Sequence, residues 1–273
     1  MTRTKLVTTC ATTLFVALSL VACDQGSGSS FARKSTTTSS QQSPVDDGTS
    51  SNGEENELTD DADTGDTGDT TGQPAPALSA VDINAARTAL GSLPTRGFSP
   101  NVPKYDRNEF GKPWSDDVTV DGGHNGCDTR NDILARDLTD VEFKPAKRNC
   151  IVTKGKLNDP YTNTTIEFKR GRKSSDLIPI DHVVALGDAW YSGAYQWDAD
   201  RRRNFANDPI NLQATNRESN TQKSAKNAAE WLPPNTAYQC EYVGRQITIK
   251  STYGLSVTPA EKNAMEKVLA TCS

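Results

Sequence analysis

The chain has 273 residues and a formal net charge of −5 at pH 7. This charge is unevenly distributed: residues 81–273 keep 26 of the 30 basic residues and 24 of the 35 acidic ones, a net charge of +2. A near-neutral region of this length suits one folded domain, and its charge neither requires nor excludes a polyanionic partner.

The first 22 residues are predicted to be a signal peptide. Arg3 and Lys5 give a positively charged start, and the mostly apolar run 6–21 is short for a membrane span. The run ends in Leu-Val-Ala-Cys, which resembles a bacterial lipoprotein cleavage site. We therefore expect cleavage before Cys23 and lipidation of its thiol, which would anchor the protein to a membrane. Ordinary secretion, with Cys23 incidental, is the alternative.

Residues 23–80 are expected to form a disordered acidic tether. Between Ser35 and Ala80 there are ten acidic residues and no Lys or Arg. Such a segment cannot bury enough apolar surface to offset its chain entropy. Calcium binding by its recurring Asp-Thr-Gly triplets is a weaker alternative, because the ligand spacing of a calcium loop is missing.

The elements predicted for residues 81–273 alternate in type along the chain. A helix at 81–93 precedes an irregular, aromatic-rich stretch at 97–114, whose rings we expect to cover an edge of the core. The later elements are helix 128–138, strands 149–154 and 164–169, strand 177–184, helices 186–192 and 198–206, strand 210–214, and helices 215–229, 236–251 and 259–270.

Four of the six cysteines lie in this region, without the close C-x-x-C spacing of a zinc cluster. In an exported domain an even number of cysteines indicates disulfides. Three pairings are possible. We favour Cys127–Cys150 and Cys240–Cys272, because each closes a short loop within one region.

The strand predicted at 177–184 contains the dipeptide Asp181-His182 between apolar and β-branched residues. His182 is one of two histidines in the chain. A charged pair inside such a run costs free energy unless something binds it. The dipeptide is therefore the first candidate for a functional site.

The order of a strand with Asp-His, a strand with Asn, and a helix with Asn and Lys resembles the ββα-metal core of HNH endonucleases. The matching positions are Asp181, His182, Asn211, Asn220 and Lys223. Residues 105–272 further resemble exported HNH-family proteins related to the C-terminal nuclease domain of GmrSD-type restriction enzymes. The stretches that carry this likeness are NGCDTRN at 125–131, IDHVVAL at 180–186, NFANDP at 204–209 and WLPP at 231–234.

The resemblance implies an α+β fold, with a ββα-metal core embedded in a mainly helical domain at 81–273 and stapled by disulfides. It implies metal-dependent hydrolysis of DNA, or of RNA, outside the cytoplasmic membrane. His182 would be the general base, Asp181 and Asn220 would hold Mg²⁺ or the compatible Mn²⁺, Asn211 would position the histidine, and Lys223 would neutralise phosphate charge. A regular strand would, however, send the Asp181 and His182 side chains to opposite faces.

Arg130, Arg203 and His124 are further candidates for substrate contact, although arginines paired with nearby acids and a solvated histidine would look the same in sequence. One rival hypothesis is a non-catalytic surface lipoprotein that binds nucleic acid or an envelope polymer through the arginines at 201–203 and the basic loop 169–173. Another is a structural lipoprotein that borrows the fold. No obligate protein partner is evident, and the expected location is the outer face of the cell membrane or the medium.

Overall fold

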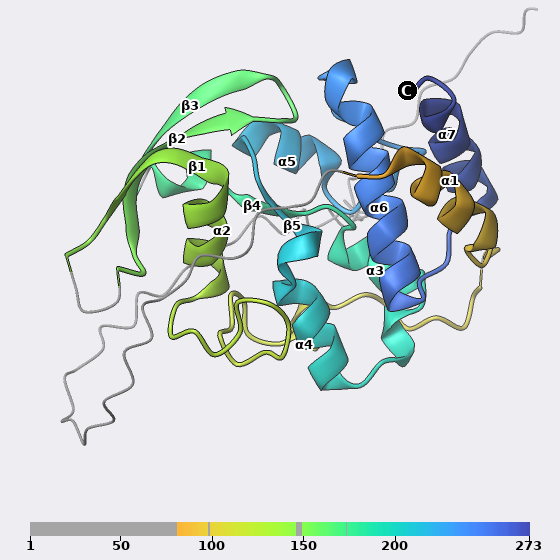
Figure 1. Cartoon of the computed structure of the whole chain (residues 1–273). Helices are drawn as coiled ribbons and strands as arrows, with labels where there is room; N and C mark the ends of the chain where they lie inside the picture. Colours follow the sequence, from red (N-terminus) through yellow and green to blue (C-terminus); the bar gives the residue numbers. More distant parts are fainter. Residues whose placement is uncertain (1–80, 98, 146–148, 173) are drawn as a thin grey trace, which may run out of the picture. The chain divides into compact units, whose positions relative to one another are not determined.

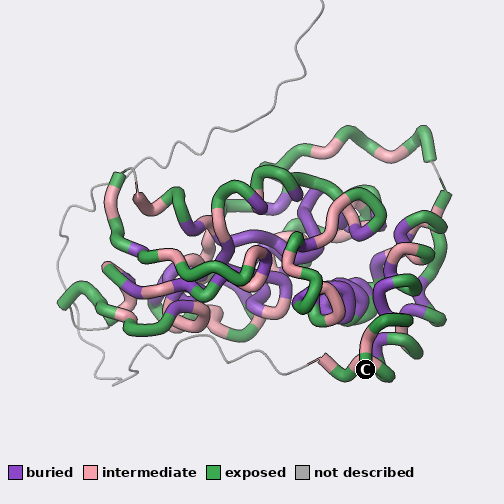
Figure 2. The backbone as a smooth tube through the Cα atoms, turned by 90° about the horizontal axis from the view of Figure 1, so that it is seen from above, coloured by how far each residue is buried: buried purple, intermediate pink, exposed green. Residues whose placement is uncertain are grey.

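The computed structural model describes residues 81–97, 99–145, 149–172 and 174–273. The predicted signal peptide and tether, with Cys23, lie outside these residues. The apolar side chains of the described part form two hydrophobic clusters, one among helices and one around the strands. Figure 2 shows buried residues along the inner parts of the chain and exposed ones on its outer turns.

The strand-rich part is a three-stranded antiparallel sheet with one helix against it, drawn on the left of Figure 1. Its elements are α2 (Thr129–Asp137), β1 (Leu138–Phe143), β2 (Val152–Asp159) and β3 (Thr164–Lys169). The Asp128 side chain accepts a hydrogen bond from the Asn131 backbone N–H and so starts α2. Ile133 and Leu134 of α2 are completely buried in the cluster around the strands. Strand β1 was not predicted, because its polar sequence shows no regular apolar alternation.

A second, two-stranded sheet lies between the two clusters. Strands β4 (Ile180–His182) and β5 (Leu212–Ala214) run antiparallel, with His182 opposite Leu212. Helix α5 (Arg217–Lys223) follows β5, so a strand–strand–helix order is present. The helix expected over 215–229 ends early, where Ser224 takes a left-handed φ of 48°.

The remaining helices form the second cluster, in the centre and on the right of Figure 1. They are α1 (Ile83–Ser92), α3 (Leu186–Tyr191), α4 (Ala199–Asn207), α6 (Gln239–Tyr253) and α7 (Pro259–Leu269). Helix α1 packs on α6 and α7. Short 3₁₀ helices connect these elements: η1 (Arg107–Phe110), η2 (Ser175–Leu177), η3 (Ala194–Gln196), η4 (Pro209–Asn211) and η5 (Thr236–Tyr238).

Both expected disulfides are present, Cys127–Cys150 beside the sheet and Cys240–Cys272 between the start of α6 and the end of α7. A mixed helix-and-strand architecture with two disulfides agrees with the predicted α+β class. Disulfides of this kind fit a location outside the cytoplasm.

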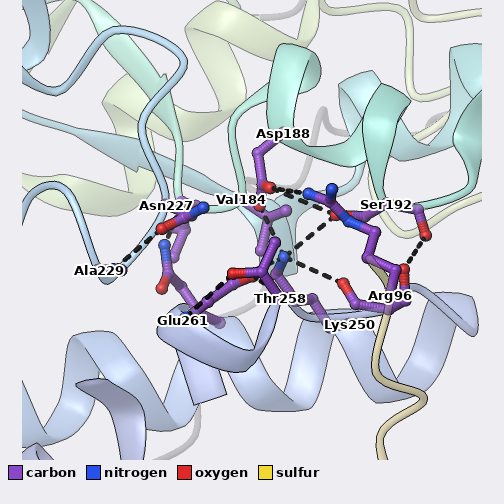
Figure 3. A network of polar contacts seen from close by, with 12 residues as sticks. Arg96, Val184, Asp188, Ser192, Asn227, Ala229, Lys250, Thr258 and Glu261 are labelled. Atoms are coloured by element: carbon purple, nitrogen blue, oxygen red, sulfur yellow. Dashed lines mark hydrogen bonds and ion pairs between the residues drawn. The ribbon is translucent and has the colours of Figure 1, made fainter. Parts of the chain in front are cut away.

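A buried network of charges joins three of the helices (Figure 3). The Lys250 ammonium on α6 lies 2.6 Å from an Asp188 carboxylate oxygen on α3 and 2.7 Å from Glu261 on α7. Arg96 lies 3.4 Å from the other Asp188 oxygen. Because Lys250 and Glu261 are fully buried, each charge depends on its partners.

None of the helices between residues 81 and 273 combines the length and apolarity needed to cross a lipid bilayer.

Candidate active site

His182 ends β4 with its ring buried between the two hydrophobic clusters. Its Nε2 lies 2.9 Å from the Ala206 carbonyl oxygen. A carbonyl can only accept a hydrogen bond, so Nε2 carries the proton of the neutral ring. The remaining ring nitrogen, Nδ1, is then an acceptor available for chemistry.

The His182 ring lines a small pocket of about 20 Å³. This volume is close to what a single water molecule needs. The lining residues are Arg107, Phe110, Gly111, Lys112, Pro113, Trp114, His182, Leu186, Ala206 and Asn207. Two of these side chains are positively charged and none is a carboxylate, so the charge around the pocket favours a nearby anion such as a phosphate.

Trp114 lies against the histidine, with the two ring planes 11° apart and the ring centroids separated by 6.0 Å. Its backbone has a φ of 56°, which is costly for a bulky residue and persists only where the surroundings enforce it. The indole limits how the imidazole can turn. Trp114 also packs against the cluster around the strands, so it covers an edge of the core as expected.

Burial lowers the pKa of His182 from 6.5 to about 3, and the positive charges of Arg107 and Lys223 act in the same direction. The hydrogen bond to Ala206 partly offsets this. The ring is therefore neutral at physiological pH, with Nδ1 unprotonated. A bound phosphate would counter the charge of Arg107 and make the histidine a stronger base.

Asn211 is fully buried and holds the backbone directly after the histidine. Its Oδ1 accepts a hydrogen bond from the Val184 N–H at 2.9 Å, and its backbone carbonyl accepts one from the Val183 N–H at 2.8 Å. These contacts fix the end of β4. Contacts of this kind would hold His182 in position.

Asp181 is absent from the lining of the pocket, and the metal-ligand role expected for it stays a prediction. Its carboxylate accepts hydrogen bonds from the Tyr161 hydroxyl at 2.7 Å and from the Lys223 ammonium at 3.0 Å. All three side chains are buried. The strand pleat explains the absence of Asp181 from the pocket, because neighbouring residues on β4 point to opposite faces.

Lys223 is likewise not placed to reach a phosphate. Its ammonium is completely buried and also donates to the His182 carbonyl oxygen at 2.7 Å. It neutralises Asp181 and ties α5 to the end of β4. The contact with substrate expected for Lys223 stays a prediction.

The residues of this conformation do not fit a divalent metal. Asp181 already has a cation as its partner, and Asn220 is half-buried one turn before Lys223 on α5. Within the described ranges, no three His, Cys, Asp or Glu side chains gather so as to hold a metal ion. No carboxylate lines the pocket in front of His182.

Arg130 is one of the three further candidates that the structure places away from the pocket. It is held inside the domain, where its guanidinium donates to the carbonyl oxygens of Ser175 at 2.9 Å and Ile178 at 3.0 Å. His124 is largely exposed, 3.9 Å from an Asp117 carboxylate oxygen. Neither residue meets His182.

The arginines of α4 also have partners within the domain. Arg203 donates to the Asp117 carbonyl oxygen at 2.8 Å and forms ion pairs with Asp117 and Asp200. Arg201 and Arg202 bond to backbone carbonyls and lie over Trp197 and Trp190 respectively. Side chains engaged in this way stabilise the fold.

Sequence reasoning missed Arg107, Lys112 and Asn207 as pocket residues, and it did not foresee that Trp114 would also stack on His182. Three of these four residues precede His182 by about 70 positions, and nothing in their spacing connects them to it. A composition signal was present, because 97–114 combines aromatic and basic residues in an irregular stretch. Only the folded chain shows that this stretch meets β4.

Two comparisons with known proteins support a family assignment. Residues 128–268 match the family described as GmrSD restriction endonucleases, C-terminal domain. The chain is also 37% identical over 203 residues to an uncharacterized secreted protein of Arthroderma benhamiae, covering 73% of this chain and 92% of that protein. No solved structure matches the chain significantly.

The matched range 128–268 includes β4, β5 and α5, and with them His182 and Asn211. The same range includes Ala206, whose carbonyl oxygen fixes the tautomer of His182. The chain belongs to the family of the C-terminal domain of GmrSD restriction endonucleases, which suggests a nuclease-like function.

Proposed function

We propose that the protein is an exported endonuclease that hydrolyses phosphodiester bonds of DNA, with His182 as the general base. The observation that carries this proposal is a buried, neutral histidine whose Nδ1 is left as an acceptor beside a water-sized pocket with a cationic rim. Family membership supports the reaction class. RNA is the alternative substrate of the same chemistry.

The reaction divides among the pocket residues. His182 Nδ1 takes a proton from a water molecule as the water oxygen attacks phosphorus. The bond from phosphorus to the leaving oxygen breaks, and that oxygen takes a proton from solvent. Arg107 and Lys112 contact the non-bridging phosphate oxygens, where negative charge increases in the transition state. Asn211 keeps the histidine in place.

Nucleases of the HNH type generally use a divalent metal, and metal dependence with Mg²⁺ or Mn²⁺ remains part of the proposal. A bound cation would supply charge neutralisation at the phosphate. The Asp181–Lys223 pair does not provide its ligands in this conformation. The chemistry assigned to this chain's own residues is therefore that of His182 and its pocket.

The exported location rests on two observations. The Arthroderma benhamiae relative is described as secreted, and two disulfides join cysteines of the described domain. Lipid anchoring through Cys23 is a further part of the proposal. It rests on the sequence before that cysteine.

The test is a nuclease assay on plasmid DNA, linear DNA and RNA with Mg²⁺, with Mn²⁺ and with chelator. We expect wild-type protein to cut DNA and His182→Ala to lose at least 10²-fold in rate, the usual contribution of a general base. His124→Ala is the matched control, because it removes the other histidine of the chain and leaves the pocket intact.

DNA and RNA that both stay intact under every condition, with wild type and His182→Ala behaving alike, would rule the nuclease out. Tight, salt-sensitive DNA binding without turnover would instead favour the non-catalytic binding module. The engaged arginines of α4 argue against that rival.

A further inference from the structure

Trp114, which stacks on His182, belongs to a loop of turns and bends between η1 and α2, residues 111–128. Among the apolar side chains of this loop, all of which the structure describes, only Val118 and Cys127 are buried. A segment with so little buried apolar surface opens more easily than the core. The contacts that hold the loop closed therefore decide whether the indole stays against the histidine.

Hydrogen bonds bring the two ends of loop 111–128 together. The Ser115 carbonyl oxygen accepts a hydrogen bond from the Thr129 hydroxyl at 3.0 Å. The Asp116 carboxylate accepts one from the backbone N–H of Asn125 at 3.0 Å and one from that of Gly126 at 2.9 Å. The start of the loop, which carries the indole, is thus fixed to its end.

The disulfide Cys127–Cys150 is the covalent anchor of that end, since it joins the loop to the chain just before β2. A disulfide generally stabilises a fold by more than one hydrogen bond does. Helix α2 has a separate tie to β2, because Asn131 Oδ1 accepts a hydrogen bond from the Val152 N–H at 3.0 Å. Opening the disulfide therefore frees the end of the loop while α2 stays in place.

The backbone of Trp114 gives the loop a second arrangement. Its φ of 56° is unfavourable for a bulky residue and persists only while the surroundings enforce it. Once the loop is loosened, the backbone returns to an ordinary conformation. This rotation moves the indole out of its stacked position, and His182 loses the ring that limits its rotation.

We propose that the Cys127–Cys150 disulfide is a redox switch of the His182 site. The oxidised protein holds Trp114 against the histidine and is active, whereas the dithiol form releases Trp114 and has low activity. This inference rests on the proposed nuclease function and adds its regulation. Trp114 acts in it as a positioning residue.

The oxidant is a disulfide, carried by a protein or a small molecule, outside the cytoplasm. Exchange forms the bond between the two cysteine sulfurs and breaks the disulfide of the oxidant, which takes up two electrons and two protons and leaves as two thiols. Because the cytoplasm keeps such cysteines reduced, a nuclease controlled in this way becomes active only after export.

The kinetic test compares wild type with Cys127→Ser/Cys150→Ser, at a temperature where circular dichroism shows both proteins folded. We expect kcat to fall on the order of 10²-fold, since a displaced histidine no longer meets the reacting water correctly. Cys240→Ser/Cys272→Ser is the matched control. It removes the other disulfide of the domain, which no residue of the pocket lining adjoins, and should keep the wild-type kcat.

An NMR spectrum gives a readout independent of activity, because the chain has only two histidines. The imidazole resonances of His182 should shift in Cys127→Ser/Cys150→Ser as the ring current of Trp114 is lost, and they should stay in place in the matched control. Hydrogen exchange should become faster in loop 111–128 of the first variant and remain slow in α2.

The two proposals fail in different ways. If wild type is active and depends on His182, but a folded Cys127→Ser/Cys150→Ser keeps full kcat and unshifted His182 resonances, the switch is wrong and the nuclease stands. A Cys127→Ser/Cys150→Ser protein that does not fold also overturns the switch, because the disulfide then serves the whole fold. A wild type without nuclease activity refutes the proposed function and, with it, the switch.

Discussion

The pKa of His182 makes stability depend on pH. In the unfolded chain the histidine takes up a proton near pH 6.5, whereas in the folded protein burial lowers its pKa to about 3. Between these values the unfolded state binds more protons, so the free energy of unfolding falls as pH drops, by up to about 1.4 kcal/mol per pH unit from this residue.

The measurement is urea unfolding of wild type and His182→Gln between pH 8 and pH 3. The difference between the two stabilities should change below pH 6.5 in the direction that weakens wild type, and it should be constant above pH 7. The comparison is needed because burial raises the pKa of Asp132 to about 7, which has the opposite effect on the pH dependence. Parallel curves for the two proteins would contradict a buried neutral histidine.

Asp181 and Lys223 give a second prediction at the scale of single residues. Lys223→Met should lower the free energy of unfolding by about 3–5 kcal/mol, because it leaves a buried carboxylate without its cationic partner. The double variant Asp181→Leu/Lys223→Met should cost less than the single one. Urea unfolding in chelator measures both. If Lys223→Met keeps wild-type stability and loses only activity, the prediction is wrong and a contact of Lys223 with the substrate is favoured.

The disulfide Cys240–Cys272 acts between elements, since it ties the start of α6 to the chain end after α7. It closes a loop with a sequence separation of 32 residues. Replacing both cysteines with serine should lower the free energy of unfolding by about 3–4 kcal/mol, mainly by loosening the unfolded chain. The His182 pocket has no lining residue from α6 or α7, so the rate at 25 °C should persist.

Thermal unfolding and the nuclease assay on the same preparation test this prediction. A loss of activity at temperatures where the double serine variant is fully folded would show that the α6–α7 pair contributes to the site. Among the elements, sequence periodicity was most reliable for α1 and α7, which have clear apolar spacing and stop signals. It was least reliable for β1 and for the end of α5. There, strand pairing and a left-handed Ser224 decide the boundary.

At the scale of the whole molecule, we predict that Cys23 decides where the protein resides. Cys23→Ala should shift the protein from the membrane fraction to the medium when it is produced in a bacterial host, because a lipidated thiol is the expected anchor. Cys10→Ala is the matched control, since Cys10 lies in the predicted leader that is removed. Fractionation followed by immunoblotting measures the distribution. Wild type found only in the medium would favour ordinary secretion.

Features that depend on local pattern and on cysteine spacing could be predicted from the sequence. These are the α+β class, most helices, both disulfides and the likeness to the family that the comparisons confirm. His182 and Asn211 were also found from sequence as a candidate pair, because a histidine in an apolar strand is conspicuous wherever it occurs. Their catalytic roles remain proposals.

The tertiary structure decided which side chains share a pocket. Asp181 accepts a hydrogen bond from Lys223 on one face of β4. His182, on the other face, stacks on Trp114, which is far away in sequence. The opposite directions of the two side chains follow from the strand pleat. The partner that each side chain meets, across as many as about 70 residues, depends on how whole elements pack, which no local pattern records. For the same reason Asn207, which looked like part of a turn after a helix, is placed beside the base.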